Sequence, residues 1–113
     1  MQVRQYEQNG VQIVEARGKF LGGSETEELD QRLYALLGRE EKKVVLDLGH
    51  ADWINSSGIA ILIHHWKKFR DIGGCLKLAN LTQKIEKLLV ISKLTQVFET
   101  FDSLEEAVAS FKD

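Results

Sequence analysis

The sequence predicts an α/β fold in which helices pack on a four- to five-stranded mixed sheet. Strand-like segments, which show apolar alternation or continuous apolar runs, alternate along the chain with helix-like segments, whose apolar residues recur every three or four positions. Glycine pairs or helix-capping residues separate these segments, and the chain contains no proline. The order β-β-α-β-α-β-α-(β)-α requires mostly parallel crossovers between strands. We expect one domain over residues 1–113, because this length suits a single core.

The first part of the chain predicts a hairpin followed by a helix. Residues 11–16 alternate as a strand does, and residues 3–7 pair with them across Asn9-Gly10, two residues that tolerate positive φ. Ser24 and Glu27 then have the spacing of a capping box at a helix start. The apolar stripe of this helix is Leu29, Leu33, Leu36 and Leu37, and Gly38 is its expected end.

The rest of the chain predicts a buried strand, a long helix and four shorter elements. Residues 43–48 contain the continuous apolar run of a strand that is covered on both faces. A helix over about 57–72 follows, and Gly73-Gly74 ends it. The face of this helix expected to pack on the sheet contains Ile59, Leu62, Ile63, Trp66 and Phe69. The remaining elements are a strand at 75–79, a helix from Thr82, a strand at 97–101 and a helix capped by Ser103 with Glu106.

Composition narrows the class of function. The formal net charge of −2 gives no basic field for a nucleic-acid backbone, so we expect no direct nucleic-acid partner. The longest apolar run, Ile59 to Ile63, is far too short to cross a bilayer, and the first residues do not resemble a signal peptide. The lone Cys75 cannot form an internal disulfide. These features predict a cytoplasmic protein without direct membrane contact.

The candidate functional site is the segment 51–57, which links the expected central strand to the longest helix. Partner chemistry in open α/β sheets gathers at the carboxyl ends of strands. Asn55, Ser56 and Ser57 are all good N-cap residues, but a helix needs only one cap, so at least one hydroxyl is free. A phosphate there would meet unpaired N–H groups and the positive end of the helix dipole. By itself, the spacing favours a well-capped helix without further function, because serine-rich caps are common.

Residues 44–48 (Val-Val-Leu-Asp-Leu), followed by Trp-Ile-Asn-Ser-Ser-Gly-Ile-Ala-Ile-Leu at 53–62, closely resemble the signature of the STAS domain family. Arg17-Gly18-Lys19-Phe20 and residues 102–107 also look like family features. Small stand-alone members are bacterial anti-sigma factor antagonists. The resemblance implies a protein-binding module whose motif serine is phosphorylated by an anti-sigma factor that is also a serine kinase, and dephosphorylated by a PP2C-type phosphatase. The unphosphorylated form would bind the anti-sigma factor and release a sigma factor, which is called partner switching.

Carried over by position, the resemblance makes Ser56 the phospho-acceptor and Ser57 the adjacent hydroxyl and cap, with Gly58 completing the motif. The family's aspartate is Asn55 here. An amide can orient a serine hydroxyl but cannot accept its proton, although it repels phosphate less and can donate to it. Asn55 therefore favours an alternative, in which the chain is a constitutive STAS subunit of a transporter or signalling assembly without a phosphorylation switch.

Other residues near this motif are candidates for partner binding. Ile61 and His65 fall on the outer face of the long helix with Lys68 and Ile72, where they could form a docking stripe or be ordinary surface residues. Trp53 could anchor a partner or pack over the sheet edge. Another strand-to-helix loop, expected at the same end of the sheet, contains Gly22, Gly23 and Ser24.

Catalysis, metal binding and cofactor binding are not expected. His64 and His65 are adjacent in a helix and point about 100° apart, so they cannot chelate one metal. A nucleophile elbow needs glycine two residues before its serine, where Ile54 stands. The glycine pairs lack nucleotide-binding spacing. Cys75 is expected to be a small core residue.

Overall fold

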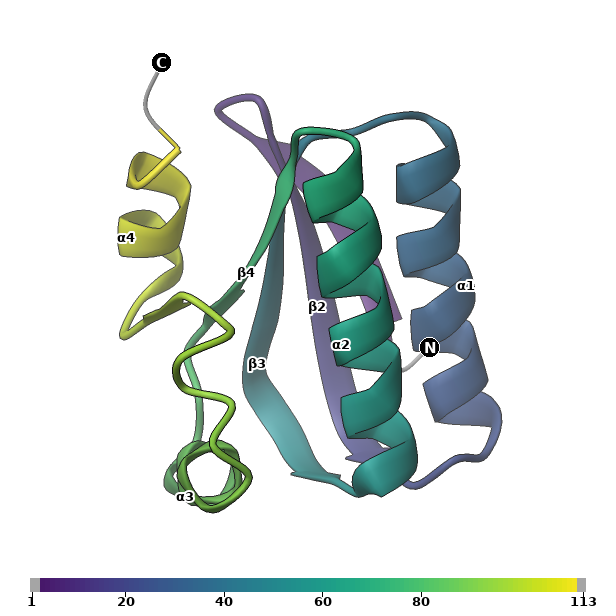
Figure 1. The fold of residues 1–113 in the computed structure, drawn as a ribbon, viewed down its shortest axis with the longest axis vertical. Coiled ribbons are helices and arrows are strands. Elements are labelled where there is room, and N and C mark those ends of the chain that lie inside the picture. Colours follow the sequence, from purple (N-terminus) through teal and green to yellow (C-terminus); the bar gives the residue numbers. More distant parts are fainter. Residues whose placement is uncertain (1–2, 112–113) are drawn as a thin grey trace.

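The computed structural model describes residues 3–111, which form a five-stranded mixed sheet and four helices (Figure 1). The strand order is β1-β2-β3-β4-β5; β1 runs antiparallel to β2, and the other neighbouring strands are parallel. This architecture confirms the predicted fold class. The strands are β1 (Val3–Gln8), β2 (Val11–Phe20), β3 (Lys43–Ile54), β4 (Cys75–Ala79) and β5 (Thr100–Phe101), and the helices are α1 (Ser24–Gly38), α2 (Ser56–Asp71), α3 (Gln83–Ile91) and α4 (Leu104–Ala109).

Helices cover both faces of the sheet, but unequally. Figure 1 shows α1 and α2 side by side on one face, α4 on the other, and α3 near the end of the sheet where α2 begins. The larger core cluster lies under α1, α2 and α3 and includes Val44 and Leu46, whereas Val45 belongs to a smaller cluster with Ala107 and Val108 of α4. Consecutive β3 residues thus enter opposite cores, which explains the continuous apolar run.

The hairpin forms as the sequence predicts. Asn9 and Gly10 have φ values of 53° and 81°, and Gln8 pairs with Val11 on the two sides of the turn. Positive φ at both central residues matches the twist of the flanking strands. The two strands are longer than expected, and β2 continues to Phe20.

Strand β3 is six residues longer than predicted. It continues from Leu48 to Ile54, so residues 51–54 are strand rather than loop. Pairing with β2 persists through two register shifts and ends with Phe20 opposite Ile54. The last strand is shorter than predicted: β5 contains only two residues, because the N–H groups of Val97 and Phe98 donate back to the Leu94 carbonyl in a turn.

The expected capping box of α1 is wrong. Gly23 is the N-cap, it offers no side-chain cap, and Ser24 is already the first helical residue. The hydroxyl of Thr26 instead accepts a hydrogen bond from Gly22 N at 2.9 Å. The predicted Ser103 cap is confirmed, because Ser103 Oγ accepts from Glu106 N. Thr82, the expected start of the third helix, is the N-cap of α3, and its Oγ1 accepts from Ile85 N.

Cys75 is not the core residue that the sequence suggested. Its side chain is half-buried at the start of β4, and Sγ lies 3.6 Å from Glu99 Oε2. Burial raises the pKa of the Cys75 thiol, and the nearby Glu99 carboxylate raises it further.

Among residues 3–111, no helix is long and apolar enough to span a membrane, and no group of three potential metal ligands is brought together.

Candidate functional site

The candidate site forms where the parallel strands β2 and β3 end. The two strands stay paired up to their last residues, and Asn55 N donates to the Phe20 carbonyl at 3.1 Å. The loop after β2 therefore meets the start of α2. A Cβ at Gly22, where φ is +94°, would lie 3.3 Å from Ser57 Oγ. This contact confirms the expectation that the two strand-to-helix loops lie at the same end of the sheet.

Asn55 is the N-cap of α2. Its Oδ1 accepts hydrogen bonds from Ser57 N at 3.0 Å and from Gly58 N at 3.3 Å, and its backbone is extended. The expectation that Ser57 caps the helix is therefore wrong, since Ser57 already lies in the first turn. An aspartate oxygen could accept the same two bonds, so the capping geometry does not depend on the exchange of aspartate for asparagine.

Ser56 and Ser57 begin α2 with exposed side chains. Within residues 3–111, neither hydroxyl takes part in a hydrogen bond, so the free hydroxyl that the sequence predicts is present at both positions. The first turn of α2 contains no acidic residue. A phosphoryl group on either serine would thus meet the positive end of the helix dipole without a neighbouring carboxylate in that turn.

Gly58 allows α2 to start close to the strand ends. A Cβ at this position would lie 2.5 Å from Ile54 Cγ2 and 3.2 Å from the Phe20 carbonyl oxygen. Only glycine lets the helix approach both strands this closely without displacing backbone. The motif glycine therefore fixes the position of Ser56 relative to the sheet.

An open groove of about 480 Å³ lies beside Ser56, between α2 and α3. Sequence reasoning missed this groove, because Ile59 and Ile63 were assigned to the helix face that packs on the sheet, and they are only partly buried. Its position depends on where α3 packs, which no local pattern reveals. The apolar wall is formed by Trp53, Ile59, Ala60, Ile63 and Leu88, with Asn55 and Ser56 at one end.

The predicted docking stripe on the outer face of α2 is wrong. His65 is fully buried, and its Nε2 lies 2.7 Å from Asp30 Oδ1 of α1. Ile61 is partly buried, and Ile72 packs against the larger core cluster. The helical period correctly identified the face of α2 that packs on the sheet. It could not show that α1 would cover the face that contains His65.

The buried His65 ring leaves one nitrogen without a partner. Its Nδ1 is buried and has no hydrogen bond within the described residues, while Nε2 is held by Asp30. Burial lowers the pKa of His65, and the Asp30 carboxylate opposes this shift. His65 is therefore part of the packing between α1 and α2 rather than of an exposed surface.

Comparison with known proteins agrees with this architecture. The STAS domain model matches residues 2–107. A Bordetella bronchiseptica protein provisionally named anti-sigma factor antagonist BtrV is 33% identical over 92 residues, which are 81% of this chain and 79% of BtrV.

Two solved structures show the same fold at lower identity. A Thermotoga maritima protein, TM1081, provisionally described as an anti-sigma factor antagonist, has a TM-score of 0.88 at 17% identity, with 96% of this chain and 92% of that chain covered. The phosphorylated form of the Bacillus cell fate determinant SpoIIAA has a TM-score of 0.76 at 12% identity, with 97% and 99% covered. With its sheet order, its Asn-Ser-Ser-Gly helix start and a match over residues 2–107, the chain belongs to the STAS domain family.

Proposed function

We propose that this protein is an anti-sigma factor antagonist whose binding is switched by phosphorylation of Ser56. The observation that carries the proposal is the place of Ser56: an exposed hydroxyl on the first residue of α2, at the end of an apolar groove. The names of BtrV and TM1081 support the class of partner. The proposed role of this chain is to bind an anti-sigma factor, and this role requires no catalysis by the chain itself.

The start of α2 is chemically suited to a phosphoserine. Phosphorylation adds a charge of roughly −1.5 to −2 and three acceptor oxygens. These oxygens would lie near the first-turn N–H groups, and an anion there gains about 0.3–1 kcal/mol from the helix dipole. The Asn55 side-chain N–H₂ makes no hydrogen bond within residues 3–111, which leaves it available as a further donor.

The same phosphate would oppose docking of a partner. The unmodified groove offers Trp53, Ile59 and Ile63 with a neutral serine at its end, which suits an apolar segment of an anti-sigma factor. Burying a phosphate at such an interface without a cationic partner costs several kcal/mol of desolvation, on the order of the penalty for an unpaired charge. The unphosphorylated form therefore binds and the phosphorylated form is released.

The proposed partners are an anti-sigma factor with serine kinase activity and a PP2C-type phosphatase that restores Ser56. Such a cycle operates in the cytoplasm, and it requires no contact of this chain with nucleic acid or membrane. The alternative, a constitutive STAS subunit, drew its support from Asn55. Asn55 caps α2 through its oxygen as an aspartate could, so the cap does not distinguish the two functions, and the phosphorylation assay decides between them.

The decisive experiment incubates the chain with ATP and the cognate anti-sigma factor and measures intact mass. Wild type and the matched control Ser57→Ala are expected to gain one phosphoryl group, and Ser56→Ala to gain none. In a binding assay, Ser56→Asp should weaken binding to the anti-sigma factor about tenfold or more, equivalent to at least 1.4 kcal/mol. Phosphate on Ser57 would refute the assignment of Ser56 as the acceptor. No phosphate on wild type, or equal binding by Ser56→Asp and wild type, would refute the switch and support a constitutive subunit.

A further inference from the structure

Strand β1 forms a free edge of the sheet. It pairs with β2 on one side and has no strand on its other side among residues 3–111. Opposite residues in an antiparallel pair alternate between hydrogen-bonded and non-bonded positions. Because the two-residue turn is closed by Gln8 and Val11, this alternation directs the backbone N–H and C=O groups of Gln5 and Glu7 away from β2.

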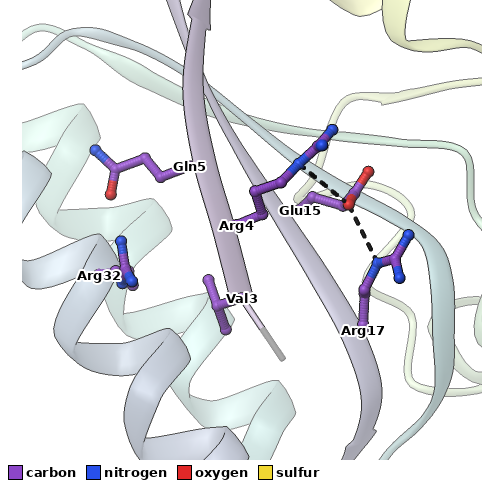
Figure 2. Close-up of a pocket in the computed structure, with 6 residues that line it drawn as sticks. All are labelled: Val3, Arg4, Gln5, Glu15, Arg17 and Arg32. Carbon is purple, nitrogen blue, oxygen red and sulfur yellow. Dashed lines mark hydrogen bonds and ion pairs between the residues drawn. The ribbon is translucent and has the colours of Figure 1, made fainter. Parts of the chain in front are cut away.

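A cavity of about 530 Å³ borders the start of this edge (Figure 2). In Figure 2, Arg4, Glu15 and Arg17 lie on one side of β1, and Val3, Gln5 and Arg32 lie on the other. Arg32 comes from α1 and Arg17 from β2, so three elements place guanidinium groups around the edge strand.

Glu15 orders the two arginines on its side of the strand. Its side chain is only 9% exposed, and its Oε1 lies 3.6 Å from Arg4 Nε and 3.3 Å from Arg17 Nε. One carboxylate cannot neutralise two guanidinium groups, whose side chains are 67% and 54% exposed. Asp47, the neighbour of Glu15 on β3, is buried and accepts from Gly49 N and Asn80 Nδ2.

On the Arg4 and Arg17 side of this edge the accessible charges are therefore positive, with the carboxylates of Glu15 and Asp47 buried behind them. On the other side Arg32 is paired with Glu28 at 3.9 Å and Glu7 is exposed, so that side is not positive. We propose that β1 is a second docking site, where an extended acidic segment of a partner protein adds to the sheet. Its backbone would bond to the outward groups of Gln5 and Glu7, as in strand addition to other sheet edges. Every second side chain would point to the Arg4 and Arg17 side, where acidic residues would be paired.

A second copy of this chain fits the same edge less well. Antiparallel pairing of two β1 strands would bring the exposed Arg4 and Arg17 side chains of both copies to one side of the joined sheet, where each copy is already positive. The β1 site goes beyond the proposed function, since β2 separates it from β3 and it does not involve Ser56. Either proposal can fail while the other stands.

The test is an NMR titration of the full ¹⁵N-labelled chain with a blocked peptide of alternating Glu and Val. The backbone amides of Val3, Gln5 and Glu7 are expected to shift, and a peptide of alternating Lys and Val should cause no shift. Gln5→Pro removes one outward N–H, whereas the matched control Gln5→Ala keeps it. Gln5→Pro should weaken binding about tenfold relative to Gln5→Ala, and Arg17→Gln about threefold.

Several results would overturn the proposal. One is that the acidic peptide shifts only amides of α2 and α3. Another is that inorganic phosphate alone shifts the same β1 amides as the acidic peptide does. A third is that the acidic and the basic peptide bind equally well. Shifts of β1 amides with protein concentration alone would assign the edge to a second copy instead. A proline is tolerated where an edge N–H faces solvent, and thermal unfolding checks the fold of Gln5→Pro. Should Gln5→Pro not fold, the two peptides and Arg17→Gln decide the outcome.

Discussion

Asn55 Oδ1 lies 3.0 Å from the backbone nitrogen of Ser57, so the residue beside the proposed phospho-acceptor holds the first turn of α2 in place. The amide thereby combines two tasks. It satisfies N–H groups that the helix start would leave unpaired, and it keeps Ser56 outside those bonds, with its hydroxyl free.

Loss of this cap should destabilise the fold. We expect Asn55→Ala to lower the free energy of unfolding by about 1 kcal/mol, because Ser57 N and Gly58 N lose their acceptor. Asn55→Asp should match or slightly exceed wild type, since a carboxylate keeps the cap and adds a favourable charge near the helix dipole. Urea denaturation measures both values. An unfolding free energy of Asn55→Ala equal to wild type would contradict the assigned cap.

Substitution of the motif glycine should be costly despite alanine's higher helix propensity. Gly58→Ala places a Cβ against Ile54 and the Phe20 carbonyl, and overpacking of this kind costs about 1–3 kcal/mol. Gly38→Ala is the matched control, because a Cβ at the end of α1 meets nothing within 4 Å. Thermal unfolding should show a lower Tm for Gly58→Ala alone. Similar Tm values for the two variants would show that α2 can shift away from the strands at little cost.

The buried His65 should make stability depend on pH. Its folded pKa is lowered by burial from an ordinary value of 6.5, so below that value the unfolded chain binds a proton that the folded chain resists. The contribution of neutral His65 is complete above pH 6.5 and is lost as the pH falls toward the folded pKa. Denaturation at pH 8 and pH 5.5 should show a smaller loss of stability in His65→Leu than in wild type.

The control for this pH dependence is His64→Leu, which removes the exposed neighbour and keeps the pair between His65 and Asp30. Its loss of stability on acidification should resemble that of wild type. Equal losses in wild type and His65→Leu would show that other groups cause the acid sensitivity.

The C-terminal helix should depend on a buried lysine. Lys77 Nζ, on a side chain that is 8% exposed, donates to Ser110 Oγ at 2.8 Å and lies 4.1 Å from the centre of the Phe111 ring. Ser110→Ala removes the closest acceptor, so we expect a loss of about 1 kcal/mol and faster amide hydrogen exchange in α4. Ser92→Ala, at an exposed serine after α3, should change neither quantity. Unchanged exchange in α4 of Ser110→Ala would mean that apolar packing alone holds the helix.

The sequence predicted features that depend on neighbours along the chain. Asn9-Gly10 specifies its turn through positive φ, and the periodicity of α2 identified the face that packs on the sheet. It did not predict features that depend on packing between distant segments. The burial of His65 requires α1, and the groove beside Ser56 requires α3. Ser24 had the spacing of a cap, but the chain enters α1 one residue earlier, at Gly23.

The isolation of the Ser56 hydroxyl from every internal hydrogen bond within residues 3–111 has a consequence for the lifetime of the protein. Under the proposed function, adding or removing a phosphoryl group breaks no bond that holds the chain folded. The phosphorylated form should then resist proteases at least as well as the unmodified form, because the phosphate is favoured by the helix dipole and proteolysis samples the unfolded fraction. A cell could keep a full reserve of the phosphorylated protein and return it to use by hydrolysis alone, without new synthesis.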